Sequence, residues 1–74
     1  MKNFDHILVF KTNIKSQDDI QVLQSLLDTH DEIEQWNVDL NDEDCVLRVV
    51  TYRLSNQDVI DLVCQHGYAC AELQ

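Results

Sequence analysis

The chain has 74 residues, 45% of them apolar, with one glycine and no proline, which predicts a single compact domain over residues 1–74 without linkers or disordered tails. A domain of this size buries only about 60% of the surface of its unfolded chain, so we expect no deep active-site cavity. Fourteen acidic residues against five Lys and Arg give a formal charge of −9, which argues against nucleic acid and anionic membranes as partners and favours a basic or metal-bearing partner.

The first predicted element is a strand over residues 4–11, which is rich in β-branched and aromatic residues. Its apolar centre, Ile7 to Phe10, is too short for a signal peptide or a membrane span. We therefore expect a mature, soluble protein of the cytoplasm without membrane insertion.

The first predicted helix begins at Ser16 and ends in the polar stretch 28–32. Ser16 and Asp19 have the spacing of a capping box, in which a hydroxyl and a carboxylate accept hydrogen bonds from N–H groups at the helix start. His30, in the polar stretch, would favour the helix dipole when charged. The apolar stripe of this helix falls at spacings of three and four, on Ile20, Leu23, Leu26 and Leu27.

Residues 33–40 alternate in polarity, which predicts a half-exposed strand whose inward face a bulge near Ile33 could adjust. The acidic turn at 41–44 joins it to a third predicted strand at 45–52, which would be its hairpin partner. The buried face of the second strand is expected to carry Trp36, Val38 and Leu40.

A second helix is predicted from Ser55 to Gly67, and it opens with the same polar pattern as the first. Gly67 suits a left-handed turn at the helix exit, because other residues meet a steric penalty there. A short strand at 68–73 completes the order βαββαβ. This order predicts a ferredoxin-like α+β sandwich, a four-stranded antiparallel sheet with two helices on one face.

The three cysteines are odd in number and follow no zinc-site spacing, so reduced thiols in a cytoplasm are expected rather than a disulfide framework. Cys45 and Cys70 are expected to be buried as small apolar side chains. Cys64 and His66 would point about 200° apart on a helix, which makes them poor co-ligands of one metal ion. His6 is expected on a strand surface.

Three parts of the sequence carry a family resemblance when they are taken in order. They are the apolar stripe from Leu23 to Leu27, Ile33 followed by Val38-Asp39-Leu40, and Gly67-Tyr68 after the second helix. Together they resemble the heavy-metal-associated domain, the small fold of copper chaperones and of the N-terminal modules of metal-exporting ATPases. The resemblance extends from Ile7 to Leu73 and implies metal trafficking without enzyme activity.

The metal loop departs from that family. The family carries Gly-Met-Thr-Cys-x-x-Cys between its first strand and first helix, where this chain has residues 13–19. Ser16 and Asp19 stand at the two cysteine positions, and Ile14 stands at the methionine position. Because Cu(I) prefers thiolate sulfur to hydroxyl or carboxylate oxygen, we expect no high-affinity Cu(I) binding at this loop.

A divalent metal site is a second hypothesis. The predicted topology brings the loop 12–15, the turn 41–44 and the corner 66–67 to one end of the sandwich. Carboxylates with one imidazole would suit Zn, Mn, Mg or Ca. The alternative is that Ser16 and Asp19 only cap the helix and that the acidic turn is solvated. The candidate ligands in these connections are Asp18, Asp19, Asp42, Glu43, Asp44 and His66.

Nothing in the sequence indicates an enzyme, because it has no glycine-rich phosphate loop and no histidine paired with a nucleophile. We predict a small domain that resembles metal-trafficking proteins without their thiolate pair, with a degenerate metal-binding or metal-homeostasis role. The alternative is a protein-interaction or small-ligand-sensing module on the same scaffold. The acidic turn 41–44 or the acidic corner of Asp31, Glu32 and Glu34 would then steer a basic protein partner. Exposed edge strands would give a monomer or a weak homodimer.

Overall fold

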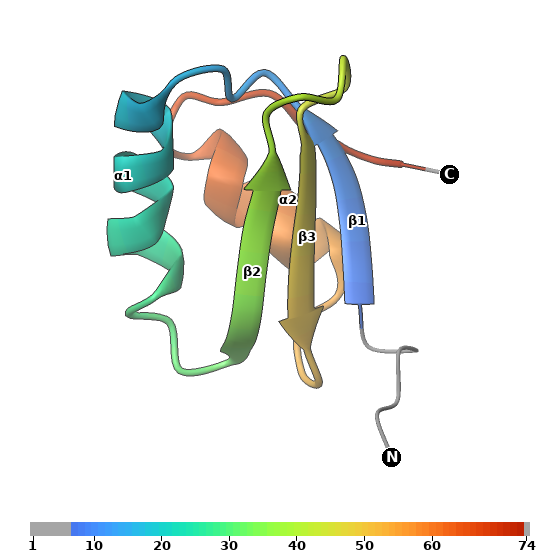
Figure 1. Ribbon diagram of the computed structural model, residues 1–74. Coiled ribbons are helices and arrows are strands. Elements are labelled where there is room, and N and C mark those ends of the chain that lie inside the picture. The colour runs from blue at the N-terminus through green and yellow to red at the C-terminus, as the bar shows by residue number, and fades with distance from the viewer. Residues whose placement is uncertain (1–6, 74) are drawn as a thin grey trace.

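The computed structural model describes residues 7–73 of the chain (Figure 1). The strands and helices follow one another in the order βαββαβ, as the sequence predicts. Residues 4–6 of the predicted first strand, and with them His6, lie outside the described residues. The elements are β1 (Ile7–Thr12), α1 (Gln17–Leu27), β2 (Ile33–Asp39), β3 (Val46–Thr51), α2 (Asn56–Cys64) and β4 (Cys70–Glu72).

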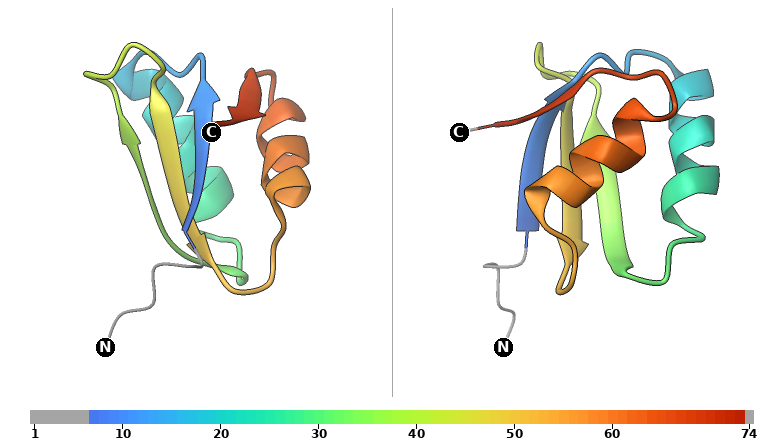
Figure 2. Two further views of the ribbon diagram at one scale, coloured as in Figure 1. Left: turned by 90° about the vertical axis from the view of Figure 1, so that its right-hand side faces the viewer. Right: turned by 180° about the vertical axis from the view of Figure 1, so that it is seen from behind.

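The four strands form one antiparallel sheet in the order β2-β3-β1-β4. Both helices cover the same face of this sheet, as the views from the side and from behind show (Figure 2). Among residues 7–73, no helix lies on the opposite face of the sheet. The predicted ferredoxin-like α+β sandwich is confirmed, with β2 and β4 as its two edge strands.

The hydrophobic core lies between the sheet and the helices. β1 and β3 occupy the centre of the sheet, and the alternation of their side chains places Phe10, Leu47 and Val49 on the helical side. α1 and α2 complete the core with residues four apart, which share one face of a helix. The fully buried side chains are Phe10, Ile14, Leu23, Leu27, Leu47, Val49, Val59 and Val63.

The predicted bulge in β2 is present. The pairing of β2 with β3 shifts between Ile33 and Gln35, so one extra residue changes which side chains point inward. As a result Ile33 and Trp36 both pack against the core, as do Val38 and Leu40 further along. Trp36 also donates a hydrogen bond from Nε1 to Asp28 Oδ1 at 2.6 Å, which ties β2 to the end of α1.

Several predicted boundaries were wrong by one or more residues. Cys45 does not begin β3, since its φ of 47° places it in the left-handed region, and its N–H donates to Asp42 O at 2.9 Å to close the turn. α2 ends at Cys64, so His66 lies in the following turn and not on the helix. His30 likewise lies beyond α1, where its Nδ1 accepts from Glu32 N at 3.1 Å.

Gly67 takes the left-handed conformation that the sequence predicts, with a φ of +90°. Its N–H donates to Cys64 O at 3.0 Å, which lets the chain leave α2 and turn toward β4. Within residues 7–73, no helix is long and apolar enough to cross a membrane.

We expect Gly67→Ala to lower the free energy of unfolding by about 1–2 kcal/mol, because a Cβ is strained at positive φ. No heavy atom lies within 4 Å of the Cβ that would be added, so backbone strain alone would cause the loss. Urea denaturation measures it. Gly67→Asn is the matched control and should cost less, since asparagine tolerates this conformation. Equal stability of Gly67→Ala and the natural protein would contradict the prediction.

Candidate functional site

The loop between β1 and α1 meets two other connections at one end of the sheet. Thr12 donates its N–H to Asp44 O at 3.0 Å and its hydroxyl to Cys45 O at 2.7 Å, which joins the loop to the β2–β3 turn. Asn13 Oδ1 accepts from Ala69 N at 2.9 Å, which joins it to the segment before β4. The loop and the turn therefore meet as predicted, whereas the third partner is the segment at Ala69 and not the corner 66–67.

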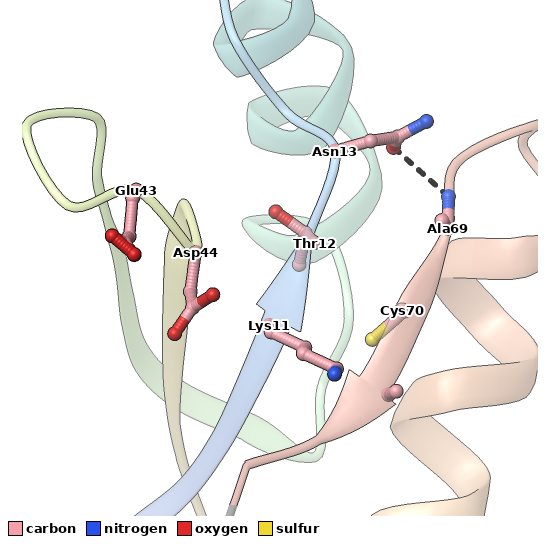
Figure 3. A pocket seen from close by; sticks show the side chains of 8 residues that line it. Lys11, Thr12, Asn13, Glu43, Asp44, Ala69 and Cys70 are labelled. Atoms are coloured by element: carbon pink, nitrogen blue, oxygen red, sulfur yellow. Dashed lines mark hydrogen bonds between the residues drawn. The ribbon is translucent and has the colours of Figure 1, made fainter.

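A shallow pocket of about 310 Å³ lies between these connections. The side chain of Lys11 lies across its floor, with Glu43 and Asp44 on the side of the turn and Cys70 on the side of β4 (Figure 3). The walls thus bring one cation, two carboxylates and one thiol together. The pocket is open to solvent.

The start of α1 is held by Ser16 and Asp19. The Ser16 hydroxyl accepts from Asp19 N at 3.2 Å, as in an ordinary N-cap. The carboxylate of Asp19 accepts from Lys15 N at 3.2 Å through Oδ2 and from the Tyr68 hydroxyl at 3.0 Å through Oδ1. Ile14 beside them is fully buried, which agrees with the packing role expected for it.

The two helix starts differ, although the sequence predicts that they are alike. In α2 the box is complete, because Ser55 Oγ accepts from Asp58 N and Asp58 Oδ2 accepts from Ser55 N. In α1 the carboxylate of Asp19 reaches one residue further back and also turns toward Tyr68. The predicted equivalence was wrong because a tertiary contact, which sequence spacing does not contain, competes for the Asp19 carboxylate.

The hydrogen bonds at Asp19 shift two pKa values. The N–H of Lys15, followed by the hydroxyl of Tyr68, lowers the pKa of Asp19 below 3.8, because both donors favour the charged carboxylate. Desolvation, followed by the hydrogen bond to Asp19, raises the pKa of Tyr68 above 10.0. Asp19 is therefore an anion at neutral pH that already binds protein donors at both oxygens.

The other predicted metal ligands lie apart from this pair. Asp18 is exposed on the first turn of α1, and His66 lies beside Val22 and Leu26 in a groove of about 380 Å³. His66 Nδ1 is 3.1 Å from Leu62 O. Across residues 7–73, no three His, Cys, Asp or Glu side chains gather in a group that could hold a metal ion. The structure therefore does not bring Asp18, Asp19 and His66 together, and their role as ligands stays a prediction.

The acidic turn shapes itself with its own carboxylates. Asp39 Oδ1 accepts from Asn41 N at 3.0 Å, and Asp42 Oδ1 accepts from Asp44 N at 2.9 Å. Each carboxylate accepts from the N–H two residues further on and so stabilises the turn, as aspartate side chains commonly do. Glu43 and Asp44 are left exposed at its tip.

All three cysteines are free thiols. Cys45 is buried as expected, with 7% of its surface exposed. Cys70 was also expected to be buried, but it lies on an edge strand and is only half-buried, although it packs against the core. Cys64 is exposed. Burial, followed by the neighbouring Cys64, raises the pKa of Cys70 to about 11.

Comparison with solved structures relates this fold to a known one. The apo form of the HMA domain of the copper chaperone for superoxide dismutase superposes with a TM-score of 0.78 and 22% sequence identity. The match covers 92% of this chain and 66% of that chain, so the protein spans about two thirds of the neighbour's length. No protein-family model matches the sequence, and a comparison with curated proteins found no match. The chain therefore has the fold of a heavy-metal-associated domain, as the sequence predicts.

We expect Tyr68→Phe to raise the pKa of Asp19 toward 3.8, because one of its two donors is lost, and carboxyl-carbon NMR titration measures this. A lowered pKa stabilises the fold above the unfolded value of 3.8 and loses that effect as pH falls through the folded value. The acid-dependent loss of stability below pH 3.8 should therefore shrink in Tyr68→Phe.

Tyr52→Phe provides the control for this titration. Tyr52 follows β3 at the opposite end of the sheet, so its removal should leave the pKa of Asp19 unchanged. An unchanged Asp19 titration in Tyr68→Phe would show that the hydroxyl contact does not form in solution.

Proposed function

We propose that this protein is a small, single-domain, non-enzymatic module of metal homeostasis in the cytoplasm, whose metal loop has become a structural helix cap. The fold of a heavy-metal-associated domain supports the proposal, as does the resemblance of the sequence to that family. The loop at the start of α1 supports it further, because the resemblance sets Ser16 and Asp19 at the positions of the family's cysteines.

One observation carries the proposal. Both oxygens of Asp19 accept hydrogen bonds, from Lys15 N and from the Tyr68 hydroxyl, and the Ser16 hydroxyl accepts from Asp19 N. The two side chains that replace the cysteines therefore hold the backbone and the neighbouring loop. They also present hard oxygen atoms, which Cu(I) binds less well than sulfur. We infer that this loop does not retain Cu(I).

Chelator competition under reducing conditions tests this inference. We expect the double variant Ser16→Ala/Asp19→Ala to retain as much Cu(I) as the natural protein, because neither side chain is a ligand. Ser16→Cys/Asp19→Cys should retain one additional Cu(I) per chain, because it restores two thiolates at a helix start, where the dipole favours anions.

Each outcome of the copper titration has a distinct meaning. Loss of Cu(I) in Ser16→Ala/Asp19→Ala would overturn the proposed function, because it would place the metal at the loop. Failure of the cysteine variant to gain Cu(I), with its circular dichroism unchanged, would show that the loop no longer has the geometry of a thiolate site.

A protein-interaction role is the second candidate, and the charge of the surface favours it. Neither α1 nor α2 contains a Lys or Arg, whereas each contains two aspartates. The exposed tip of the β2–β3 turn adds Glu43 and Asp44 at the same end as the loop. Such a surface steers a basic partner toward the loop end. We propose that the partner carries a cationic surface and that the protein acts as a monomer or a weak homodimer.

We expect Glu43→Lys/Asp44→Lys to abolish capture of a basic partner from the native cytoplasm, because it reverses the charge beside the loop. The matched control is Asp31→Lys/Glu34→Lys, which changes the net charge equally at exposed residues of the other end. Capture should survive in this control. An equal loss in both variants would mean that overall charge, and not a docking site at the turn, governs the interaction.

A further inference from the structure

The face of the sheet that points away from the helices is apolar along its two central strands. Phe10 of β1 is fully buried on the helical side, so its neighbour Val9 points to the other side of the sheet. Val9 lies opposite Arg48 of β3, and Ile7 lies opposite Val50. Residues that lie opposite each other in an antiparallel pair share a face, so these four side chains stand together.

Charged residues of the neighbouring positions complete this surface. Lys11 is two positions after Val9 on β1, and Asp39 of β2 lies opposite Val46, which is two positions before Arg48 on β3. Both therefore lie on the same side of the sheet. Figure 1 looks onto this side, with the helices behind it. We call it the open face, and its residues are Ile7, Val9, Lys11, Asp39, Arg48 and Val50.

The apolar residues of the open face are not part of the hydrophobic core. Ile7, Val9 and Val50 are half-buried, and none of them is among the side chains that pack against the core. An antiparallel strand with one face in water alternates apolar and polar residues, whereas a strand covered on both faces is apolar almost throughout. β1 begins with four apolar residues in succession, and Arg48 is the one charged residue of β3. The central strands thus have the composition of strands covered on both sides, although residues 7–73 place helices on one side alone (Figure 2).

The charges of the open face are complementary to themselves. Arg48 lies among the apolar side chains and is exposed. Within residues 7–73, the ion pair of the structure joins Arg53 to Glu32 and does not include Arg48. Asp39 supplies a carboxylate to the same face. A two-fold contact brings the same surface of two molecules together, so it can place the guanidinium of each copy against the carboxylate side of the other.

The charges of the other surfaces also favour a second copy at this face. The chain carries a formal charge of −9, and neither helix contains a Lys or Arg. Two copies that meet through their helices would repel each other, whereas the open face presents Lys11 and Arg48. A basic partner would be attracted to the helices and the acidic turn and not to these cations.

We propose that the open face is the contact surface between two copies of this chain, which pack sheet against sheet about a two-fold axis. Sheets packed in this way lie about 10 Å apart, and their inner side chains interdigitate. Burial of Ile7, Val9 and Val50 would supply the apolar contact, and the helices would remain on the outside of the dimer. This inference goes beyond the proposed function and is independent of the metal role. It assigns the homodimer to the open face instead of the edge strands.

Sedimentation equilibrium under reducing conditions tests the dimer, because a reductant excludes disulfides through the exposed Cys64. We expect a mass that rises with concentration from the 8.6 kDa of one chain toward twice that value. Val9→Lys should raise the dissociation constant at least about tenfold, because each copy would bury an unpaired ammonium in the contact. Val22→Lys is the matched control, since it makes the same substitution at an apolar residue of α1 that is 41% exposed. It should dimerise like the natural chain, and circular dichroism checks that both variants fold.

A second pair of variants tests the charge at the centre of the contact. Arg48→Glu should weaken the dimer, because it leaves carboxylates of both copies facing one another. Arg53→Glu changes the net charge equally at a residue after β3 whose side chain is 78% exposed. It should leave the dissociation constant unchanged.

Methyl NMR of the natural chain locates the contact without any variant. On dilution we expect the methyl signals of Val9 and Val50 to shift, while those of Leu23 and Val59 in the core stay in place. Shifts confined to the amides of β2 would overturn the proposal, because they would assign the dimer to an edge strand.

The remaining outcomes are equally decisive. A natural chain that keeps the mass of a monomer at every concentration overturns the proposal and leaves the open face to a different protein or to residues 1–6. An equal loss of dimer in Val9→Lys and Val22→Lys also overturns it, because net charge would then govern association. None of these outcomes bears on the copper titration of the loop at Ser16 and Asp19.

Discussion

The carboxylate of Asp19 joins two parts of the chain that lie 49 positions apart, and the arrangement of the loop end depends on it. One oxygen accepts from the backbone directly before α1, and the other accepts from the hydroxyl of Tyr68 after α2. Asp19 thereby fixes the first turn of α1 against the segment that leads into β4. A thiolate at this position would bind a soft metal but would be a weaker acceptor for these two donors. The residue at position 19 therefore cannot be both a good ligand for a soft metal, which requires sulfur, and a good acceptor for these two hydrogen bonds, which requires oxygen.

A threonine hydroxyl makes hydrogen bonds to the neighbouring loops at each end of the sheet. At the loop end, the hydroxyl of Thr12 donates to Cys45 O and accepts from Ile14 N. At the other end, the hydroxyl of Thr51 donates to Glu32 O and accepts from the N–H groups of Arg53 and Leu54. Each threonine ends a central strand and satisfies backbone groups of the next turn, which would be costly to leave without partners. Hydrogen bonds therefore attach the loops at both ends to β1 and β3, the two central strands that contribute to the core.

Sulfur and oxygen ligands are distributed unevenly over this scaffold. Ser16 and Asp19, which the sequence resemblance sets at the cysteine positions of the heavy-metal-associated domain, both take part in hydrogen bonds at the start of α1. Two of the three thiols lie instead where α2 meets β4. Both helices contain aspartates and neither contains a Lys or Arg, and the β2–β3 turn adds the exposed Glu43 and Asp44 at the loop end.

The sequence by itself determined the order of elements, the positions of the caps, the bulge near Ile33 and the left-handed turn at Gly67. These features follow from local causes, namely the periodicity of apolar residues, the hydrogen-bonding capacity of serine and aspartate, and the steric freedom of glycine. The same reasoning identified Ser16 as the residue that caps α1, because its hydroxyl can accept from the N–H of Asp19 three positions on.

Only the tertiary structure decided what the side chains contact. The bond from Tyr68 to Asp19 and the bond from Trp36 to Asp28 join residues whose spacing carries no signal. The left-handed conformation of Cys45 likewise depends on the turn that encloses it. Periodicity places a side chain on a face, but the packing of helices on the sheet selects its partner, because that choice depends on distances across the sandwich.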